Sequence, residues 1–124
     1  MPPSLTRRAR WLGQRGEQLA AEYLQAQGYT ILARNWRCPS GEIDIVARHG
    51  DILVFVEVRA RRAARYGTPE ESITPRKRSK LVAAAYTYLQ EAELTESNWR
   101  IDVVAIELAS DGAVRRLNVV QYAI

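Results

Sequence analysis

The sequence predicts an α/β fold in which one sheet is flanked by helices, with elements in the order αβββαββ. Three observations lead to this prediction. The chain has 124 residues, which suits one domain with one core. Its content of 47% hydrophobic and 26% charged residues is that of an ordinary folded protein. Helical spacing then alternates with short β-branched runs, without an internal repeat or a linker.

The first half of the chain predicts one helix followed by three strands, over residues 12–27, 29–37, 41–47 and 52–61. Gly28 stands directly after the helical spacing, where a C-terminal glycine is common. The strands are rich in β-branched and aromatic residues. Between the last two, the run Arg48-His49-Gly50-Asp51 predicts an exposed turn. These two strands are therefore expected to pair as a hairpin.

The second half predicts a basic loop, a second helix and two further strands, over residues 62–72, 75–88, 100–108 and 114–122. The helix is expected to start at Pro75, because Thr74 is a good N-cap residue and proline fits the first helical position. One face of this helix is apolar and is formed by Leu81, Ala84, Ala85 and Tyr88. Asp111-Gly112 predicts the turn between the last two strands.

Composition excludes several kinds of site. The single cysteine, Cys38, rules out an internal disulfide, and the single histidine, His49, rules out a His or Cys/His metal cluster. Catalysis by serine or cysteine with a histidine base would have to use His49, which the predicted turn places in solvent. Any metal ion must therefore be held by carboxylates, which favour a hard ion such as Mg²⁺ or Mn²⁺.

Neither a membrane span nor a secretory leader is predicted. The longest stretch without a formal charge is residues 23–33, far shorter than the roughly 18 apolar residues of a transmembrane helix. The basic start of the chain is followed by glycines and charged residues rather than by an apolar segment. The sequence therefore predicts a cytoplasmic protein without a membrane partner.

Positive charge is concentrated in one part of the chain. The formal net charge is +4, but residues 59–80 alone hold eight basic residues against two acidic ones, so the remainder is slightly acidic. Most of the basic residues are arginines, whose guanidinium groups make forked contacts with phosphate. The block predicts either a polyanionic partner, nucleic acid first, or an ordinary solvated surface.

Two acidic residues interrupt strands that otherwise look buried. Glu57 lies within the apolar run 54–58, and Asp44 follows Ile43 in the preceding strand. A buried carboxylate costs roughly several kcal/mol unless it is ion-paired, hydrogen-bonded, protonated or metal-bound. Either acid alone could pair with Arg59 or Arg61. Two acids on consecutive strands of a hairpin favour a shared cation at one end of the sheet.

A third acid, Glu17, also lies in an apolar setting. On a helical wheel it falls within the arc of Ala20, Ala21 and Leu24. Small residues on the same turn, including Gly16, allow neighbouring structure to approach closely. The alternative interpretation is an acid near the helix start that is favoured by the helix dipole.

The second predicted helix begins with an unusual cluster of positive charge: Arg76, Lys77, Arg78 and Lys80. Positive charge opposes the helix dipole at this end. The arrangement makes sense where phosphates bind, because backbone N–H groups and cationic side chains then act together. Lys77 lies four residues before Leu81 and is therefore expected to face the sheet rather than bulk solvent.

Several stretches of the sequence together resemble the bacterial YraN family: Gly16-Glu17, Gly28-Tyr29, Arg34-Asn35-Trp36-Arg37, Gly41-Glu42-Ile43-Asp44-Ile45-Val46, Val54-Phe55-Val56-Glu57-Val58-Arg59-Ala60-Arg61, Thr74-Pro75-Arg76-Lys77 and Arg100-Ile101-Asp102-Val103-Val104. That family is assigned by similarity to the restriction-endonuclease-like superfamily of PD-(D/E)xK nucleases, close to archaeal Holliday junction resolvases. The resemblance implies a single nuclease-like domain over residues 1–124, with an αβββαβ core and a mixed central sheet flanked by helices.

The resemblance also implies a set of catalytic residues: Glu17, Asp44, Glu57 and Arg59. The first motif acid of the superfamily falls on Asp44, the (D/E)xK motif on Glu57-Val58-Arg59, and the helix glutamate of the resolvase branch on Glu17. In such enzymes the two motif carboxylates and the carbonyl of the intervening residue, here Val58, bind Mg²⁺ or Mn²⁺. The metal lowers the pKa of a bound water and neutralises charge on the scissile phosphate.

Arg59 departs from the superfamily pattern, in which this position is usually lysine. Arginine stays protonated and cannot relay a proton from water, but it can hold a phosphate or orient the attacking water. Lys77 is a candidate replacement for the missing lysine. Asp102, which also matches the family pattern, is expected to be structural and to pair with Arg100, Arg61 or a backbone donor.

The sequence thus leads to one main hypothesis and two rivals. We expect a metal-dependent endonuclease that hydrolyses DNA phosphodiester bonds, with branched junctions as a candidate substrate and a homodimer as an open alternative to the monomer. The DNA groove is expected to be bordered by Arg61, Arg62, Arg65, Arg76, Lys77 and Lys80. One rival is a non-catalytic DNA-binding module that keeps the fold, for which Arg59 is the strongest argument. The other is a structural or partner-binding domain.

Overall fold

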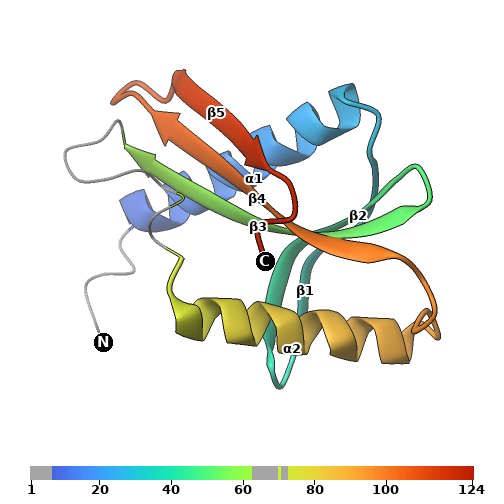
Figure 1. Cartoon of the computed structure of the whole chain (residues 1–124). Coiled ribbons are helices and arrows are strands. Elements are labelled where there is room, and N and C mark those ends of the chain that lie inside the picture. Colours follow the sequence, from blue (N-terminus) through green and yellow to red (C-terminus); the bar gives the residue numbers. More distant parts are fainter. Residues whose placement is uncertain (1–6, 63–69, 71–72) are drawn as a thin grey trace.

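The computed structural model describes residues 7–62, 70 and 73–124, with side chains from residue 11 onward (Figure 1). Its elements are α1 (Arg7–Ala26), β1 (Thr30–Cys38), β2 (Gly41–His49), β3 (Ile52–Arg62), α2 (Pro75–Glu91), β4 (Trp99–Leu108) and β5 (Val114–Val120). The strands form one sheet in the order β1-β2-β3-β4-β5. Strands β3 and β4 run parallel, whereas the other three neighbouring pairs are antiparallel. The predicted α/β fold with a mixed sheet flanked by helices is confirmed, and it agrees with a restriction-endonuclease-like core.

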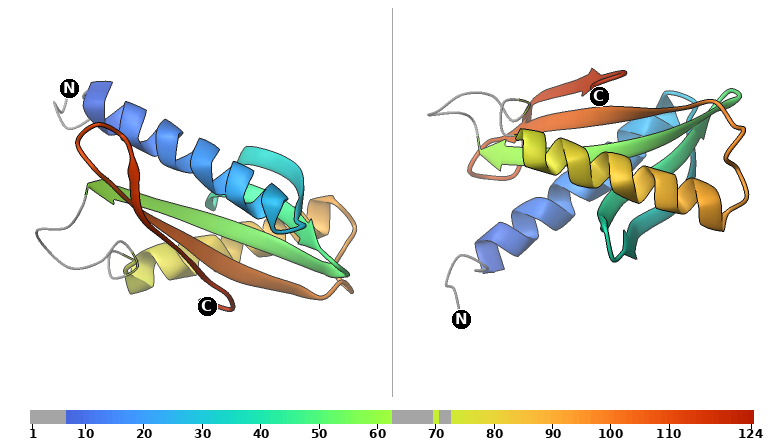
Figure 2. Two further views of the ribbon diagram at one scale, coloured as in Figure 1. Left: turned by 90° about the horizontal axis from the view of Figure 1, so that it is seen from above. Right: turned by 60° about the horizontal axis from the view of Figure 1, so that its bottom comes forward.

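The two helices cover opposite faces of the sheet (Figure 2). Leu24 of α1 and Val54 of β3 belong to one buried cluster, and Leu89 of α2 and Phe55 of β3 belong to another. Alternate residues of β3 therefore enter two different cores, because successive side chains of a strand point to opposite faces. This double burial explains why β3 is apolar over most of its length.

Helix α2 starts as predicted. Thr74 is the N-cap, its side-chain oxygen accepts a hydrogen bond of 3.2 Å from the backbone N–H of Lys77, and Pro75 occupies the first helical position. Helix α1, in contrast, begins at Arg7 rather than at residue 12. The helix was predicted only from residue 12 onward, although the arginines and the alanine directly ahead of that position are good helix formers. Within the described part of the chain, no helix is long and apolar enough to cross a bilayer.

Helix α1 approaches β3 most closely at Gly16. A Cβ atom at this glycine would overlap the side chain of Ala60. Both residues are thus small where the helix and the strand meet. This close packing brings Glu17, the next residue along α1, to the region where β2 and β3 separate.

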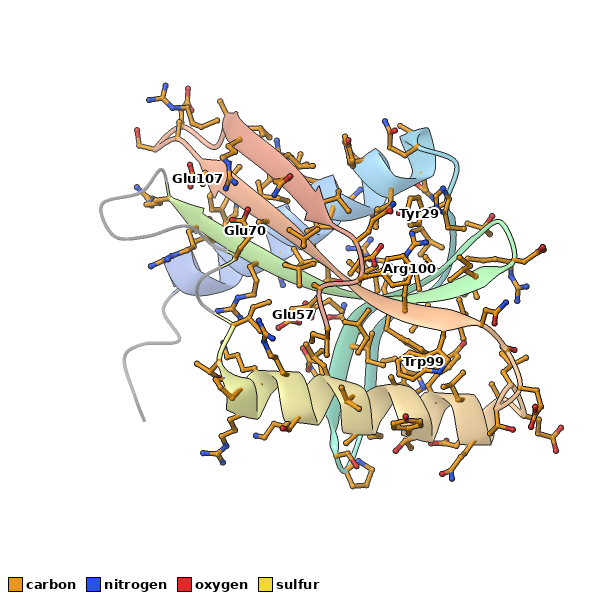
Figure 3. The ribbon with its side chains drawn as sticks, viewed as in Figure 1. Tyr29, Glu57, Glu70, Trp99, Arg100 and Glu107 are labelled. Atoms are coloured by element: carbon orange, nitrogen blue, oxygen red, sulfur yellow. The ribbon has the colours of Figure 1, made fainter. Side chains whose placement is uncertain are left out.

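The prediction that His49 is a solvated turn residue is wrong. His49 ends β2 and is half-buried, with its ring stacked on that of Tyr29 at a centroid distance of 4.0 Å and an interplanar angle of 2°. Its Nδ1 atom lies 3.1 Å from a guanidinium nitrogen of Arg100 (Figure 3). The sequence reasoning treated the turn by itself and had no means to place Tyr29 and Arg100 beside it.

Asp102 is structural, as predicted. It is fully buried, and Arg100 Nε donates to both of its carboxylate oxygens at 3.0 Å. The backbone N–H of Tyr122 donates to the same carboxylate, also at 3.0 Å. Because Tyr122 takes a left-handed backbone conformation (φ 52°) to reach Asp102, strand β5 ends at Val120 instead of continuing to residue 122 as predicted.

Candidate metal and nucleic-acid site

Strands β2 and β3 pair near their connecting turn and then separate. Their register runs from His49 opposite Ile52 to Ile45 opposite Val56, where the ladder ends. The next row along this register places Asp44 opposite Glu57. Beyond that row the β1–β2 hairpin turns away from β3 (Figure 1), and its Gly41 lies against the backbone of Lys80 in α2. We call the space between the separating strands the fork.

The backbone of β3 turns its polar groups toward the fork at Val58. The N–H group of Val58 donates a hydrogen bond of 2.8 Å to Oδ2 of Asp44. In a strand, the N–H and C=O groups of one residue point to the same side, so the Val58 carbonyl is directed toward β2 as well. The carboxylates of Asp44 and Glu57 and the carbonyl of Val58 are therefore brought together at one place.

Burial, together with a shared hydrogen bond to the neighbouring Glu57 and the negative charge of that residue, raises the pKa of Asp44 to about 8. The hydrogen bond from Val58 opposes this shift. Asp44 consequently keeps a proton at neutral pH in the absence of a cation. A cation bound by the two carboxylates would displace that proton.

Glu17 approaches the same place from helix α1. Its carboxylate accepts hydrogen bonds from Asn35 Nδ2 at 2.7 Å and from Arg34 at 3.4 Å. Burial raises the pKa of Glu17, and the negative charge of Asp44 adds to the shift. The structure thus brings Glu17, Asp44 and Glu57 to one region from α1, β2 and β3.

Sequence reasoning missed Arg34 and Asn35 as residues of the site. Asn35 has a left-handed backbone (φ 51°), a conformation that asparagine tolerates better than most residues. The available signal was the stretch Arg34-Asn35-Trp36-Arg37, which contributed to the family resemblance. Nothing in its spacing indicated that this strand would face helix α1.

On the α2 face of the sheet, the fork opens into a hollow of about 270 Å³. It is lined by Asp44, Glu57, Arg59, Lys77 and Lys80, among others. Figure 3 shows Glu57 on the side of β3 that faces α2. Arg59 lies close to Glu57, with 3.7 Å between a guanidinium nitrogen and a carboxylate oxygen. Lys77 is half-buried and lines this hollow, so it lies on the sheet side of α2, as predicted.

A second hollow, of about 590 Å³, opens on the α1 face of the sheet. Its walls come from α1, β1, β2 and β3 and include Glu17, Arg34, Asn35, Arg37 and Asp44. Asp44, Glu42 and Val58 line both hollows. Asp44 thus stands between two openings, one toward each helix.

The other predicted groove residues lie farther from the acids. Arg61 and Arg62 end strand β3, and Arg76 is exposed in the first turn of α2. None of these three lines either of the two hollows. Arg65 lies outside the described residues. Of the six predicted groove residues, Lys77 and Lys80 are the two that the structure places beside Asp44 and Glu57.

The arrangement of oxygen atoms limits how a metal could be held. Among the residues with described side chains, no group of three or more His, Cys, Asp or Glu residues is spaced to hold one ion. Asp44 and Glu57 could thus supply two carboxylates to an ion, without a third from Glu17. Mg²⁺ is commonly held by one or two carboxylates, with water and substrate phosphate as its other ligands. The pair, together with the Val58 carbonyl, fits such an ion.

Comparison with known proteins identifies the family. The model of the uncharacterised protein family UPF0102 matches residues 16–106, which include all three acids and both lysines of the α2-side hollow. The chain belongs to this family. UPF0102 proteins similar to it occur in Roseiflexus castenholzii (47% identity over 121 residues, covering 97% of this chain and 98% of the relative) and in Chloroflexus aurantiacus (55% over 98 residues, 78% and 79%). A third UPF0102 protein, from Dehalococcoides mccartyi, is 50% identical over 97 residues, covering 78% and 80%.

Membership of UPF0102 confirms the resemblance to the YraN family, because the two names denote the same family. The family description assigns no reaction. What the site does must therefore be argued from its own chemistry.

Proposed function

We propose that this UPF0102 protein is a metal-dependent endonuclease that hydrolyses DNA phosphodiester bonds, with residues 1–124 as a single domain. One observation carries the proposal: Asp44 and Glu57 come from two different strands and meet beside Lys77 and Lys80, while Glu17 approaches Asp44 from helix α1. Acids that are buried together raise the free energy of the folded protein, and such groups are concentrated at functional sites. Lysines beside them suit a phosphate that a cation bridges to the acids.

The proposed roles follow from the chemistry of each group. Asp44, Glu57 and the Val58 carbonyl would hold one Mg²⁺ or Mn²⁺ ion, which acidifies a water and neutralises charge on the scissile phosphate. Lys77 and Lys80 bind phosphate oxygens on the α2 side. Arg59 remains protonated, so it holds the phosphate rather than moving a proton. Glu17 orients the site through Asn35.

A non-catalytic DNA-binding module is the second candidate, and one observation favours it. Arg59 lies 3.7 Å from Glu57, so a fixed positive charge already stands beside one of the proposed metal ligands. An arginine that balances Glu57 permanently would preserve the fold without a metal. The two candidates therefore differ in whether a divalent ion is required.

A cleavage assay separates the two candidates. Linear duplex, single-stranded and four-way-junction DNA are incubated with the wild type in Mg²⁺ or Mn²⁺, and the products are resolved on denaturing gels. The nuclease is expected to cut at least one of these substrates in a metal-dependent way, and Glu57→Gln is expected to abolish cutting. Glu91→Gln, an exposed change at the end of α2, serves as the matched control.

Metal-dependent binding without any cleavage would favour the binding module. Cutting that survives Glu57→Gln would come from a contaminant and would also count against the proposal. The proposed activity places the protein in the cytoplasm, where bacterial DNA lies. A homodimer would present two sites to a branched junction, so the oligomeric state is measured by light scattering on the same samples.

A further inference from the structure

The two hollows lie on opposite faces of the sheet, with Asp44 in the wall of both. Lys77 and Lys80 line the α2-side hollow, and Arg34 and Arg37 line the α1-side hollow. Cationic side chains therefore lie on both sides of Asp44. The basic block at residues 59–80 supplies the cationic residues of the α2-side hollow only. Arg34 and Arg37, which line the α1-side hollow, belong to β1.

The two β1 arginines are accessible and weakly held. Arg37 has a side chain that is 75% exposed, and its Nε atom lies 3.0 Å from Glu42, which is itself exposed. Arg34 is 38% exposed and donates to Gln18 at 3.0 Å and to Glu17 at 3.4 Å. Exposed pairs of this kind contribute little to stability and exchange readily for another anion. Phosphate, which accepts forked hydrogen bonds from arginine, is such an anion.

The size of the α1-side hollow also bears on what it holds. At about 590 Å³ it is roughly twice as large as the α2-side hollow and falls within the range of pockets that bind small organic ligands. It therefore has room for a nucleotide and not only for a phosphate. A chain of nucleotides with one phosphate at the acids would reach the lysines on one side and the arginines on the other.

We propose that Arg34 and Arg37 form a second phosphate-binding surface, so that the substrate strand crosses the open end of the fork from the α2 face to the α1 face. This inference rests on the proposed nuclease function and extends it to the substrate's path. In this arrangement the DNA backbone is bound through phosphates on both sides of the scissile phosphodiester bond. The acids lie midway along the bound segment rather than at its end.

Salt-dependent binding measures each side separately. A fluorescein-labelled single-stranded oligonucleotide is titrated in Ca²⁺ at several salt concentrations, and its anisotropy gives the dissociation constant. The logarithm of the dissociation constant is plotted against the logarithm of the salt concentration. On single strands, each lost phosphate contact lowers the slope of this plot by about 0.7. The Arg34→Ala/Arg37→Ala double variant should therefore lose about 1.4 from the slope. Arg48→Ala, an exposed change near the other end of β2, should leave the slope unchanged.

Two further variants keep the result for the Arg34→Ala/Arg37→Ala double variant interpretable. Arg37→Ala alone should lose about 0.7 from the slope and keeps the contact between Arg34 and Glu17, so it serves if the double variant fails to fold. Lys77→Ala/Lys80→Ala reports on the α2 side. If only the lysine variant weakens binding, the second surface does not exist and the proposed nuclease site stands. If the wild type binds no DNA, the nuclease proposal and this inference both fail.

Discussion

The backbone N–H of Val58 donates a 2.8 Å hydrogen bond to the side chain of Asp44, at the place where a continued β2–β3 ladder would have required a backbone acceptor. The Asp44 side chain thus accepts the hydrogen bond of a β3 backbone N–H group that has no backbone partner once the strands separate. It also holds the carboxylate beside Glu57. One contact therefore ends the ladder, opens the fork and positions a proposed metal ligand.

The contact between Gly16 and Ala60 predicts opposite effects for two glycines of α1. Gly16→Ala should destabilise the protein by about 1–3 kcal/mol, because its methyl group would overlap Ala60 and force the helix from β3. Gly13→Ala should stabilise it by about 0.5–1 kcal/mol, because nothing lies within 4 Å and alanine favours a helix. Urea unfolding of both variants checks this. Equal effects would show that α1 does not pack on β3 as described.

The raised pKa of Asp44 predicts that the metal-free protein loses stability as pH rises from about 4 to about 8. Across this window the folded protein keeps a proton that unfolded Asp44, with its ordinary pKa of 3.8, has released. The free energy of unfolding therefore falls with pH, by at most about 1.4 kcal/mol per unit. The raised pKa of Glu17 acts in the same direction.

Asp44→Asn should flatten this pH dependence, whereas Asp51→Asn, an exposed change in the β2–β3 turn, should preserve it. Urea unfolding in metal-free buffers at pH 5, 6.5 and 8 provides the comparison. The quantity to compare is the difference in the free energy of unfolding between the wild type and Asp44→Asn. If this difference is the same at pH 8 as at pH 5, Asp44 is ionised in the folded protein and the coupling with Glu57 is wrong.

Glu70 predicts the reverse behaviour at acid pH. It accepts hydrogen bonds from Arg116 at 3.0 and 2.7 Å and from Asn118 at 2.9 Å, and the Arg116 contact chiefly lowers its pKa to about 2 (Figure 3). The pair stabilises the folded protein above pH 4.5 and loses this effect as pH falls toward 2. At pH 7, Glu70→Gln should lower the free energy of unfolding by no more than about 1 kcal/mol, because Arg116 is 39% exposed and solvent screens the pair. At pH 2.5 the acid unfolding curves of the variant and the wild type should converge. Glu93→Gln, which is exposed, should show no such convergence.

Arg59 has two possible roles, a contact to phosphate or a structural counter-charge for Glu57, and the two predict different results for its variants. If it holds phosphate, Arg59→Lys should keep or raise the cleavage rate, because lysine supplies the same charge and is the usual residue of the superfamily motif. If it balances Glu57 instead, Arg59→Ala should lower the melting temperature in metal-free buffer, since it leaves a half-buried carboxylate without its partner. Cleavage rates and melting curves of both variants decide between the two roles.

Much of the fold follows from local sequence signals. Gly28 after α1 and Thr74-Pro75 before α2 indicate where helices end and begin, and the continuous apolar run at residues 52–56 indicates that β3 is buried on both faces. The carboxylates were found because acids are costly in such surroundings. That argument works for Glu57 and Asp44 without any knowledge of the neighbouring elements.

The rest depends on contacts between residues far apart in the chain. The fork forms because Asp44 replaces a backbone partner of β3, and no local pattern indicates where a ladder will end. His49 is half-buried because Tyr29 and Arg100 come to it from other elements. In the same way, Arg34 and Asn35 lie beside Glu17 because β1, on which they stand, packs next to α1 in the folded protein. Such residues are recognisable in the structure and carry no periodic signal.

The central claim is that Asp44 and Glu57 hold one divalent cation in the fork, and calorimetric titration with Mn²⁺ tests it most directly. The wild type should bind one ion per chain and release close to one proton at pH 7, because the ion displaces the proton of Asp44. At one hundred times Kd the ion should stabilise the fold by about 2.7 kcal/mol. Asp44→Asn should abolish both the binding and the stabilisation, and Glu91→Gln should change neither. Unchanged Mn²⁺ binding by Asp44→Asn, or no binding by the wild type, would contradict the claim.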